Sequence, residues 1–396
     1  MHKIFVLLTL LFITGLCFGL VSTINFDDQA ENIAVLNVTN NGLVLDLAVP
    51  NIIFSELEIE NRIFTEMNIS GFGKKQDVGE PELPYLSRLI SVPLEANINI
   101  YYRSEKSREI SLPDFGFTQP VYPAQPSYAK NQDLSQIIFQ YSEAVYQTAD
   151  YQTNFSPFAV QEVGFLRGHR LFEVVYTPVR YNPVEKSLVI YENLVVELTF
   201  EGSNTVATDY LQAKTWSADF EKIYQAMILN YTPQRNRDVI ERFPTKYLII
   251  CHTPFIAEMQ PFVEWKSQQG FDVSIVGTDV TGTSTTSIKE YIQAIWDAAS
   301  PNDPAPSYLL LVGDTAQIPV WSYSNNLADT NTVITDNTYA VLQGSGNIPD
   351  MYYGRFSAQT IAQLTPQIEK TIMYEKMTMP DISYLGRAHL IAEYDN

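Results

Sequence analysis

Three aspartates at the ends of apolar segments are the residues of this sequence that could carry out chemistry together. Asp314 follows the run 308–312 after one glycine, Asp350 directly precedes a tyrosine-rich run, and Asp395 follows the run 388–392. Carboxylate and loop carbonyl oxygens are the ligands that a hard cation such as calcium prefers. Asp314 and Asp350 therefore define a candidate calcium site. An aspartate after a strand also caps the following turn, and the residues alone leave both explanations open.

Histidine and cysteine side chains form no comparable pattern. Cys251 and His252 are adjacent, and adjacent strand residues point to opposite faces, so the two cannot easily share a hydrogen bond. We interpret them as a buried cysteine and a histidine at a strand end. His169, between a glycine and an arginine, is interpreted as a turn or strand-edge histidine, and His389 as a core histidine. The sequence has neither transition-metal ligand spacing nor a glycine-rich phosphate loop.

The elements that would hold these aspartates are predicted by apolar runs that alternate with amphipathic segments from residue 244 onward. Strands are expected at 247–251, 272–276, 308–312, 351–353 and 388–392. Helices are expected from Thr253-Pro254 to Gly270, from a Ser287-x-x-Glu290 capping box onward, and over 359–377 with a break near Pro366. This order predicts a parallel, doubly wound α/β sheet, which binds ligands at the carboxyl ends of its strands.

The preceding residues show the period of β-structure. Apolar and polar residues alternate in short runs, separated by clusters of Pro, Asn, Asp and Gly, at 43–49, 98–102, 172–176 and 194–200. This pattern predicts a β-sandwich over 24–200. Residues 201–243 are interpreted as a linker, with a loop at 202–205, an amphipathic helix at 219–229, and an exposed stretch in which Arg235 or Arg237 is a candidate processing site. We therefore expect a multidomain protein whose α/β domain, 244–396, is truncated.

The N-terminus and the charge limit the class of protein. A positive n-region, the apolar run 4–16 and a small-x-small site ending at Gly19 predict a secretory signal peptide over 1–19. A membrane-spanning helix would need about 20 apolar residues, so we expect membrane contact only during secretion. Cleavage leaves Cys251 as the single cysteine, which excludes an intrachain disulfide. The net charge of −20 argues against nucleic-acid binding, which needs a basic surface.

Short motifs occur along the chain in an order that is typical of one family. In the second half they are YLLLVGD at 308–314 with Ile318-Pro319, then 335–340, 349–356 and 367–375. In the first half they are 80–84, 91–93 and 178–183. In this order, over residues 24–396, they resemble the gingipain-type secreted cysteine peptidases, peptidase family C25, with the family's β-rich propeptide placed first.

The resemblance implies a caspase-like α/β domain that acts on protein or peptide substrates and is covered by its propeptide through an intramolecular contact. The family's dyad is a histidine in a Gly-His-Gly setting followed by a cysteine nucleophile. Neither can be placed here, because this sequence has no Gly-His-Gly and no cysteine after Cys251. The family's calcium-binding carboxylates match Asp314 and Asp350, with the backbone of 344–348 nearby. Its helper carboxylate, which orients the catalytic histidine, matches Asp395.

Several functions fit these observations. The first is a fragment of a secreted cysteine endopeptidase precursor, whose propeptide confers latency and whose dyad lies beyond the chain end, so that this chain alone is inactive. The second is a non-catalytic secreted binding or assembly protein. The third is a sortase-like maturation peptidase of the type IX secretion system. Binding and inhibition of the catalytic domain by residues 24–230 would favour the first function.

Overall fold

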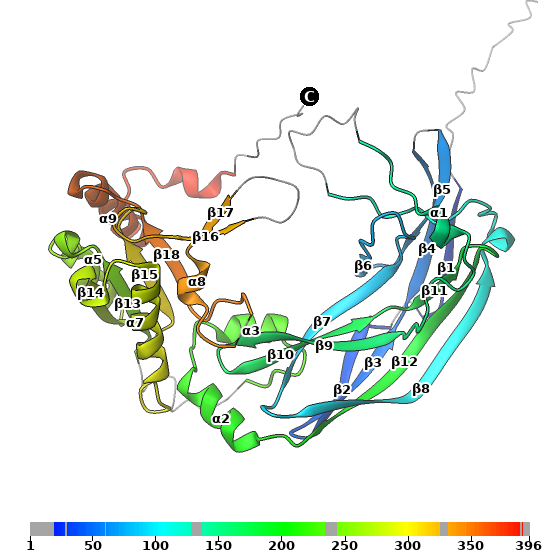
Figure 1. The fold of residues 1–396 in the computed structure, drawn as a ribbon, viewed down its shortest axis with the longest axis horizontal. Helices are drawn as coiled ribbons and strands as arrows, with labels where there is room; N and C mark the ends of the chain where they lie inside the picture. Colours follow the sequence, from blue (N-terminus) through cyan, green and yellow to red (C-terminus); the bar gives the residue numbers. More distant parts are fainter. Residues whose placement is uncertain are drawn as a thin grey trace, which may run out of the picture.

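The computed structural model describes residues 20–27, 30–59, 61–127, 137–233, 244–324, 332–344, 346–388 and 390. Within these ranges the chain forms a β-rich unit followed by an α/β unit (Figure 1). The predicted signal peptide with Gly19, the candidate processing sites Arg235 and Arg237, His389, and Asp395 with most of the predicted fifth strand lie outside the described residues. None of the helices that the structure describes is long and apolar enough to span a membrane.

The β-rich unit contains three antiparallel sheets. One has the order β1-β4-β5, formed by Val21–Asn25, Asn51–Ile59 and Arg62–Asn68. Another has the order β6-β7-β10-β9, formed by Gly73–Lys74, Pro84–Val92, His169–Tyr176 and Phe158–Leu166. The largest has the order β11-β12-β3-β2, formed by Val179–Asn182, Ser187–Glu201, Gly42–Ala48 and Ile33–Thr39, with β8, Asn97–Ser111, paired to β12.

One hydrophobic core lies between these sheets, as the alternating sequence predicts. Along β12, every second side chain is buried, including Leu188, Ile190 and Leu194. They join residues of the other sheets, such as Phe54 and Ile90, in a single cluster. Period-two alternation places one face of each strand in this core, so the predicted β-sandwich is confirmed. The helical turns within this unit are short, η1 at Leu112–Phe115 and α1 at Glu143–Tyr146.

The segment predicted as a linker contains two helices, α2 at Thr205–Lys214 and α3 at Glu221–Met227. Helix α3 was expected, whereas α2 begins where a loop was predicted. Asn204 caps α2 by accepting a hydrogen bond from the Ala207 amide, the role that makes asparagine common both at helix starts and in loops. The described part of this segment packs against the β-rich unit, because Phe220 and Tyr224 are buried with its strand residues. The stretch predicted to be exposed, with Arg235 and Arg237, lies outside the described residues.

The α/β unit is built on a parallel sheet of order β14-β13-β15-β18, formed by Asp272–Gly277, Lys246–Cys251, Tyr308–Val312 and Tyr352–Phe356. On one face, α7 (Thr285–Asp297) buries Ile288 and Trp296 against Leu248. On the other face, α5 (Gln260–Gln268) and α9 (Ile361–Glu375) pack Phe262 and Leu364 against Ile249. Helices on both faces confirm the doubly wound α/β prediction.

Several predicted boundaries were wrong. The helix expected from Thr253 starts as a 3-10 turn, η3 at Thr253–Phe255, and α5 follows only at Gln260. The capping box is formed by Ser284 and Ser287, because the hydroxyl of each serine accepts a hydrogen bond from the backbone amide of the other. Helix α7 therefore starts three residues before the predicted position. Helix α9 continues through Pro366. Between β15 and β18, where no strand or helix was predicted, the chain forms β16 at Trp321–Ser324, β17 at Thr332–Thr335 and α8 at Asn337–Ala340. A short helix, α6 at Thr278–Thr281, follows β14.

Candidate functional site

The carboxyl edge of the parallel sheet, where ligands were expected, holds Asp314. Its Oδ1 accepts a hydrogen bond from Ser357 Oγ at 2.9 Å, and its Oδ2 accepts one from Gln359 Nε2 at 2.6 Å. The Gln359 amide, a backbone N–H and the Ser357 hydroxyl together lower the pKa of Asp314. Its main chain also accepts hydrogen bonds from the amides of Gln317 and Ile318. These contacts favour the turn-capping interpretation, since Asp314 joins the loop after β15 to the residues after β18.

A partly buried ion pair that the sequence did not reveal stabilises the same edge. The Arg355 guanidinium donates to both carboxylate oxygens of Asp336, from Nε at 2.9 Å and from Nη2 at 2.6 Å. Its Nη1 donates to the carbonyls of Gly313 and Ile318 at 2.7 and 2.9 Å. A planar guanidinium can satisfy a carboxylate and two carbonyls at once, which lysine cannot. The pair therefore fixes the loop that carries Asp314.

Cys251 and His252 behave as the sequence predicts. Cys251 is fully buried, its thiol donates to the His252 carbonyl at 3.4 Å, and burial raises its pKa to about 12. A thiol with such a pKa is not a nucleophile near neutral pH, because the thiolate is the reactive form. The His252 amide donates to the Val312 carbonyl, and its ring lies 5.0 Å from the ring of Phe255.

Asp350 lies at the opposite edge of the sheet from Asp314. Tyr308 pairs with Tyr352 and Val312 pairs with Phe356 in the parallel register. Asp350 therefore precedes the start of β18, whereas Asp314 follows the end of β15. The five paired positions alone span about 13 Å, so the two carboxylates are too far apart to coordinate one ion, and the structure does not bring the two predicted calcium ligands together. Within the described ranges, no group of three or more His, Cys, Asp or Glu side chains could hold a metal ion.

The carboxylate of Asp350 is also unsuited to calcium because its oxygens accept hydrogen bonds from three backbone amides. Oδ2 accepts from Leu342 and Gln343 at 2.7 and 2.8 Å, and Oδ1 accepts from Arg167 at 2.9 Å. Asp350 is fully buried, and burial raises its pKa even though these amides act in the opposite direction. Its role is to connect chain segments. Calcium binding by Asp314 alone stays a prediction.

The amide that reaches Asp350 from the β-rich unit belongs to the tip of the β9–β10 hairpin. Leu166 pairs with His169, so Arg167 and Gly168 form a two-residue turn with φ values of 43° and 85°. Two-residue hairpin turns of this kind need positive φ at both positions. A side chain at Gly168 would also meet α2, since an added Cβ would lie 2.9 Å from the Cα of Gln212. The turn can therefore approach α2 closely only with glycine.

The Arg167 side chain continues from this turn into the α/β unit, where it is 1% exposed. Its Nη1 donates to the carbonyls of Pro306 and Asp350 at 2.8 and 2.5 Å, and Nη2 donates to the carbonyl of Ala305 at 3.3 Å. Its Nε donates to the Thr215 carbonyl at 2.9 Å. The guanidinium thus binds main-chain oxygens at the amino edge of the parallel sheet, and we call this contact the Arg167 anchor.

Aromatic rings and further hydrogen bonds surround the Arg167 anchor. The guanidinium lies 4.8 Å from the ring of Phe220 and 5.1 Å from that of Trp296, close enough for cation–π attraction. Phe220, just before α3, is also in contact with the ring of Tyr352 at 4.4 Å. The Gly168 amide donates to Gln343 Oε1 at 2.7 Å. The β-rich unit, the α2–α3 segment and the α/β unit therefore meet at one contact.

Sequence reasoning missed this contact. Arg167 was not singled out, since the arginine noted beside His169 is Arg170, and Asp350 was assigned to a metal. An Arg-Gly pair between two alternating runs is a signal for a tight hairpin turn. Nothing in the sequence, however, indicates that the turn would face residues 305 and 306 more than a hundred positions later.

Comparison with known proteins defines the class. The model of the C25 propeptide matches residues 25–233, and the model of peptidase family C25 matches residues 240–396. The chain therefore has the organisation of a propeptide followed by part of a peptidase region. It belongs to the gingipain-type C25 peptidase family, as the motif order predicted.

Individual relatives come from Porphyromonas gingivalis. Lys-gingipain is 32% identical over 86% of this chain and 19% of its own length. Gingipain R1 is 26% identical over 96% of this chain and 37% of its own length, and gingipain R2 is 29% identical over 83% of this chain and 42% of its own length. The chain thus spans less than half of the length of each of these relatives.

Two solved structures are also similar. One concerns the zymogenic latency of gingipain K from Porphyromonas gingivalis, with a TM-score of 0.42 and 24% identity, over 46% of this chain and all of that chain. The other is a complex of the pro- and mature domains of RgpB from the same organism, with a TM-score of 0.41 and 19% identity, over 51% of this chain and 99% of that chain. The family assignment depends on the sequence matches and not on these likenesses.

Proposed function

We infer that this chain is the propeptide and the first part of the peptidase region of an exported cysteine endopeptidase precursor, which hydrolyses peptide bonds in protein substrates. The observation that carries this proposal is the Arg167 anchor, because it fixes the propeptide region to the peptidase region through a fully buried contact. Membership of the family supplies the reaction class. Export to the cell surface or the medium is part of the proposal and is supported by the signal-peptide pattern of 1–19.

In such an enzyme a thiolate attacks the peptide carbonyl while a histidine acts as base. The proposal places both groups in sequence that follows this chain, and Asp395 as the carboxylate that orients the histidine. The parallel sheet described here supplies the scaffold. Its carboxyl edge is ordered by the pair of Arg355 and Asp336 and by the contacts of Asp314. The Arg167 anchor binds the amino edge of the parallel sheet. The propeptide region therefore contacts the scaffold on the side opposite the carboxyl edge, where the cleft is expected.

Latency is proposed to end when the chain is cut between the two regions, after Arg235 or Arg237. The test uses the natural gene product, purified from its own host, and measures thiol-dependent hydrolysis of fluorescent casein before and after limited trypsin treatment. We expect no activity before cleavage and activity that an alkylating agent abolishes afterwards. A variant with alanine at positions 235 and 237 should resist the cut and stay latent. A fully processed product without any peptidase activity would refute the proposal.

A second candidate function is a non-catalytic exported binding or assembly protein. It is favoured by one observation, that the sequence contains no Gly-His-Gly and no cysteine after Cys251. The same experiment separates the two functions. An inactive processed product that binds an envelope protein tightly would establish the second function, whereas thiol-dependent hydrolysis would exclude it.

A further inference from the structure

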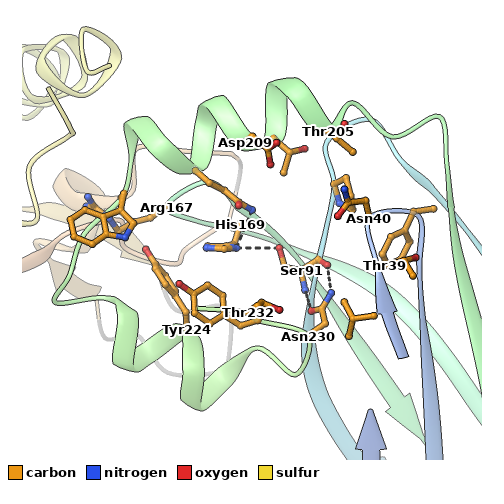
Figure 2. A pocket seen from close by; sticks show the side chains of 17 residues that line it. Thr39, Asn40, Ser91, Arg167, His169, Thr205, Asp209, Tyr224, Asn230 and Thr232 are labelled. Carbon is orange, nitrogen blue, oxygen red and sulfur yellow. Dashed lines mark hydrogen bonds between the residues drawn. The ribbon is translucent and has the colours of Figure 1, made fainter. Parts of the chain in front are cut away.

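His169 occupies a polar cavity beside the Arg167 anchor. It begins β10 directly after the two-residue turn, and it is only 7% exposed. The cavity has a volume of about 230 Å³ and lies between β7, α2 and α3, as Figure 2 shows. A histidine was expected at this turn, but burial was not. A buried imidazole that the proposed reaction does not use requires an explanation of its own.

The imidazole links several elements that are distant in sequence. Its Nδ1 lies 3.2 Å from Ser91 Oγ on β7 and 3.3 Å from Gln212 Nε2 on α2. Its ring lies 4.6 Å from the ring of Tyr224 on α3 and 5.5 Å from that of Tyr231. Because an amide nitrogen only donates, Nδ1 accepts in this arrangement and the ring carries its hydrogen on Nε2. A proton on Nδ1 would face the Nε2–H group of Gln212, so that two hydrogen-bond donors would oppose each other.

Ser91 extends this connection beyond the imidazole. Its amide donates to Asn230 Oδ1 and its carbonyl accepts from Asn230 Nδ2, both at 2.8 Å. The Leu229 amide donates to the carbonyl of Leu89 on the same strand at 2.9 Å. Figure 2 shows His169, Ser91 and Asn230 joined in this way. The hydroxyl and backbone of one serine thus hold both the imidazole and the end of the α2–α3 segment.

The cavity offers a protonated imidazole no buried counter-ion. The other charged or titratable side chains that line it are Arg167, Asp209, Tyr224 and Tyr231. Arg167 would repel a second cation. Asp209 is the carboxylate in this lining, but it is exposed to solvent. Glu221 accepts a hydrogen bond from the Tyr231 hydroxyl at 2.6 Å. Burial alone lowers the pKa of His169 to about 4.

We propose that His169 is an acid-sensitive latch, which holds the α2–α3 segment to β7 and the hairpin while it is neutral and releases the segment when it gains a proton. The reason is that the closed cavity favours the neutral ring, because Nδ1 faces the Gln212 amide nitrogen and a buried guanidinium lies in the same lining. Release takes Phe220 and the Thr215 carbonyl away from Arg167. The latch and the anchor are therefore coupled.

The sign of the effect follows from linkage. The folded-state pKa of about 4 lies below the ordinary value of 6.5, so the open segment binds more protons than the closed one between these values. Stability of the closed segment is therefore complete above about pH 6.5 and is lost as the pH falls toward 4. With an ordinary pKa in the open segment, the opening constant should rise about 30-fold from pH 8 to pH 5.

Hydrogen exchange of the full chain at pH 8 and pH 5, corrected for the intrinsic exchange rate, tests the latch. We expect amides of α2 and α3 to lose protection by about 30-fold at pH 5, while amides of β13 and β15 keep theirs. The variant His169→Gln, which cannot gain a proton, should show no such loss. The matched control His252→Gln removes a histidine outside the cavity and should respond to acid like the wild type.

A second variant tests the latch even if His169→Gln does not fold. Gln212→Glu places a carboxylate beside Nδ1, which gives the protonated ring a counter-ion, so the acid-induced loss should disappear. The latch is refuted if wild-type protection is the same at both pH values, or if both variants lose as much protection as the wild type. The latch does not depend on the proposed function. Peptidase activity is not measured here, so an inactive enzyme would leave the latch standing.

Discussion

The replacement Arg167→Ala should separate the two units of the chain. The side chain donates four hydrogen bonds to main-chain carbonyls, those of Thr215, Pro306, Asp350 and Ala305. Truncation leaves these buried oxygens without a partner and removes the guanidinium that interacts with the buried Asp350 carboxylate. Removal of one member of a buried charged network costs about 3–5 kcal/mol. We expect a loss of this size in the free energy that holds the α/β unit to the β-rich unit.

Urea denaturation of the full chain measures this loss. Tryptophan fluorescence comes from four residues, of which Trp296 lies against the Arg167 guanidinium, and far-ultraviolet circular dichroism reports both units. In the wild type the α/β unit should unfold together with its contact to the β-rich unit. In Arg167→Ala it should unfold at lower urea, as a separate transition. Arg167→Lys keeps the charge but not the planar arrangement of donors. Its loss of free energy of unfolding of the α/β unit should therefore be smaller, about 1–3 kcal/mol.

The matched control is Arg170→Ala. Arg170 lies on β10, just after the turn that holds Arg167, and is bonded within the β-rich unit, to Glu162 at 2.6 Å and to the carbonyl of Ala96 at 2.9 Å. Partly exposed ion pairs of this kind contribute about 0–1 kcal/mol, so the control should leave the two units coupled. If Arg167→Ala destabilises the α/β unit no more than Arg170→Ala does, the Arg167 anchor is not what holds the units together.

Two further outcomes are expected. Asp350→Asn should lower the free energy of unfolding by about 1–3 kcal/mol. The reason is that the new amide nitrogen would face a main-chain N–H group whose hydrogen bond the carboxylate now accepts. Urea denaturation measures this loss, and equal stability of the variant and the wild type would contradict the prediction. Millimolar calcium should produce no rise in the melting temperature that depends on Asp314 and Asp350 together, because the two residues lie at opposite edges of the sheet. A calcium-dependent rise that Asp314→Asn abolishes would instead establish a site at Asp314 alone.

Much of the fold could be predicted because its signals are local. The alternation along β12 and the all-apolar run of β15 each fix an element and its buried face. The boundaries were less secure where one residue type serves two roles. Asn204 was interpreted as part of a loop, whereas it caps α2. Ser287 was interpreted as a helix cap, whereas it is the third residue of α7 and bonds back to Ser284.

The sequence by itself determined the two kinds of domain, their order and the family, because strand period, helix period and motif order are all written along one chain. Only the tertiary structure decided what the aspartates and the Gly-His-Arg stretch do. In a parallel sheet, a residue before one strand and a residue after its neighbour lie at opposite edges, which separates Asp350 from Asp314. The same packing brings Arg167 to Asp350, 183 positions away, and encloses His169 without a buried counter-ion. Burial and register are properties of the assembled sheets, and no local pattern encodes them.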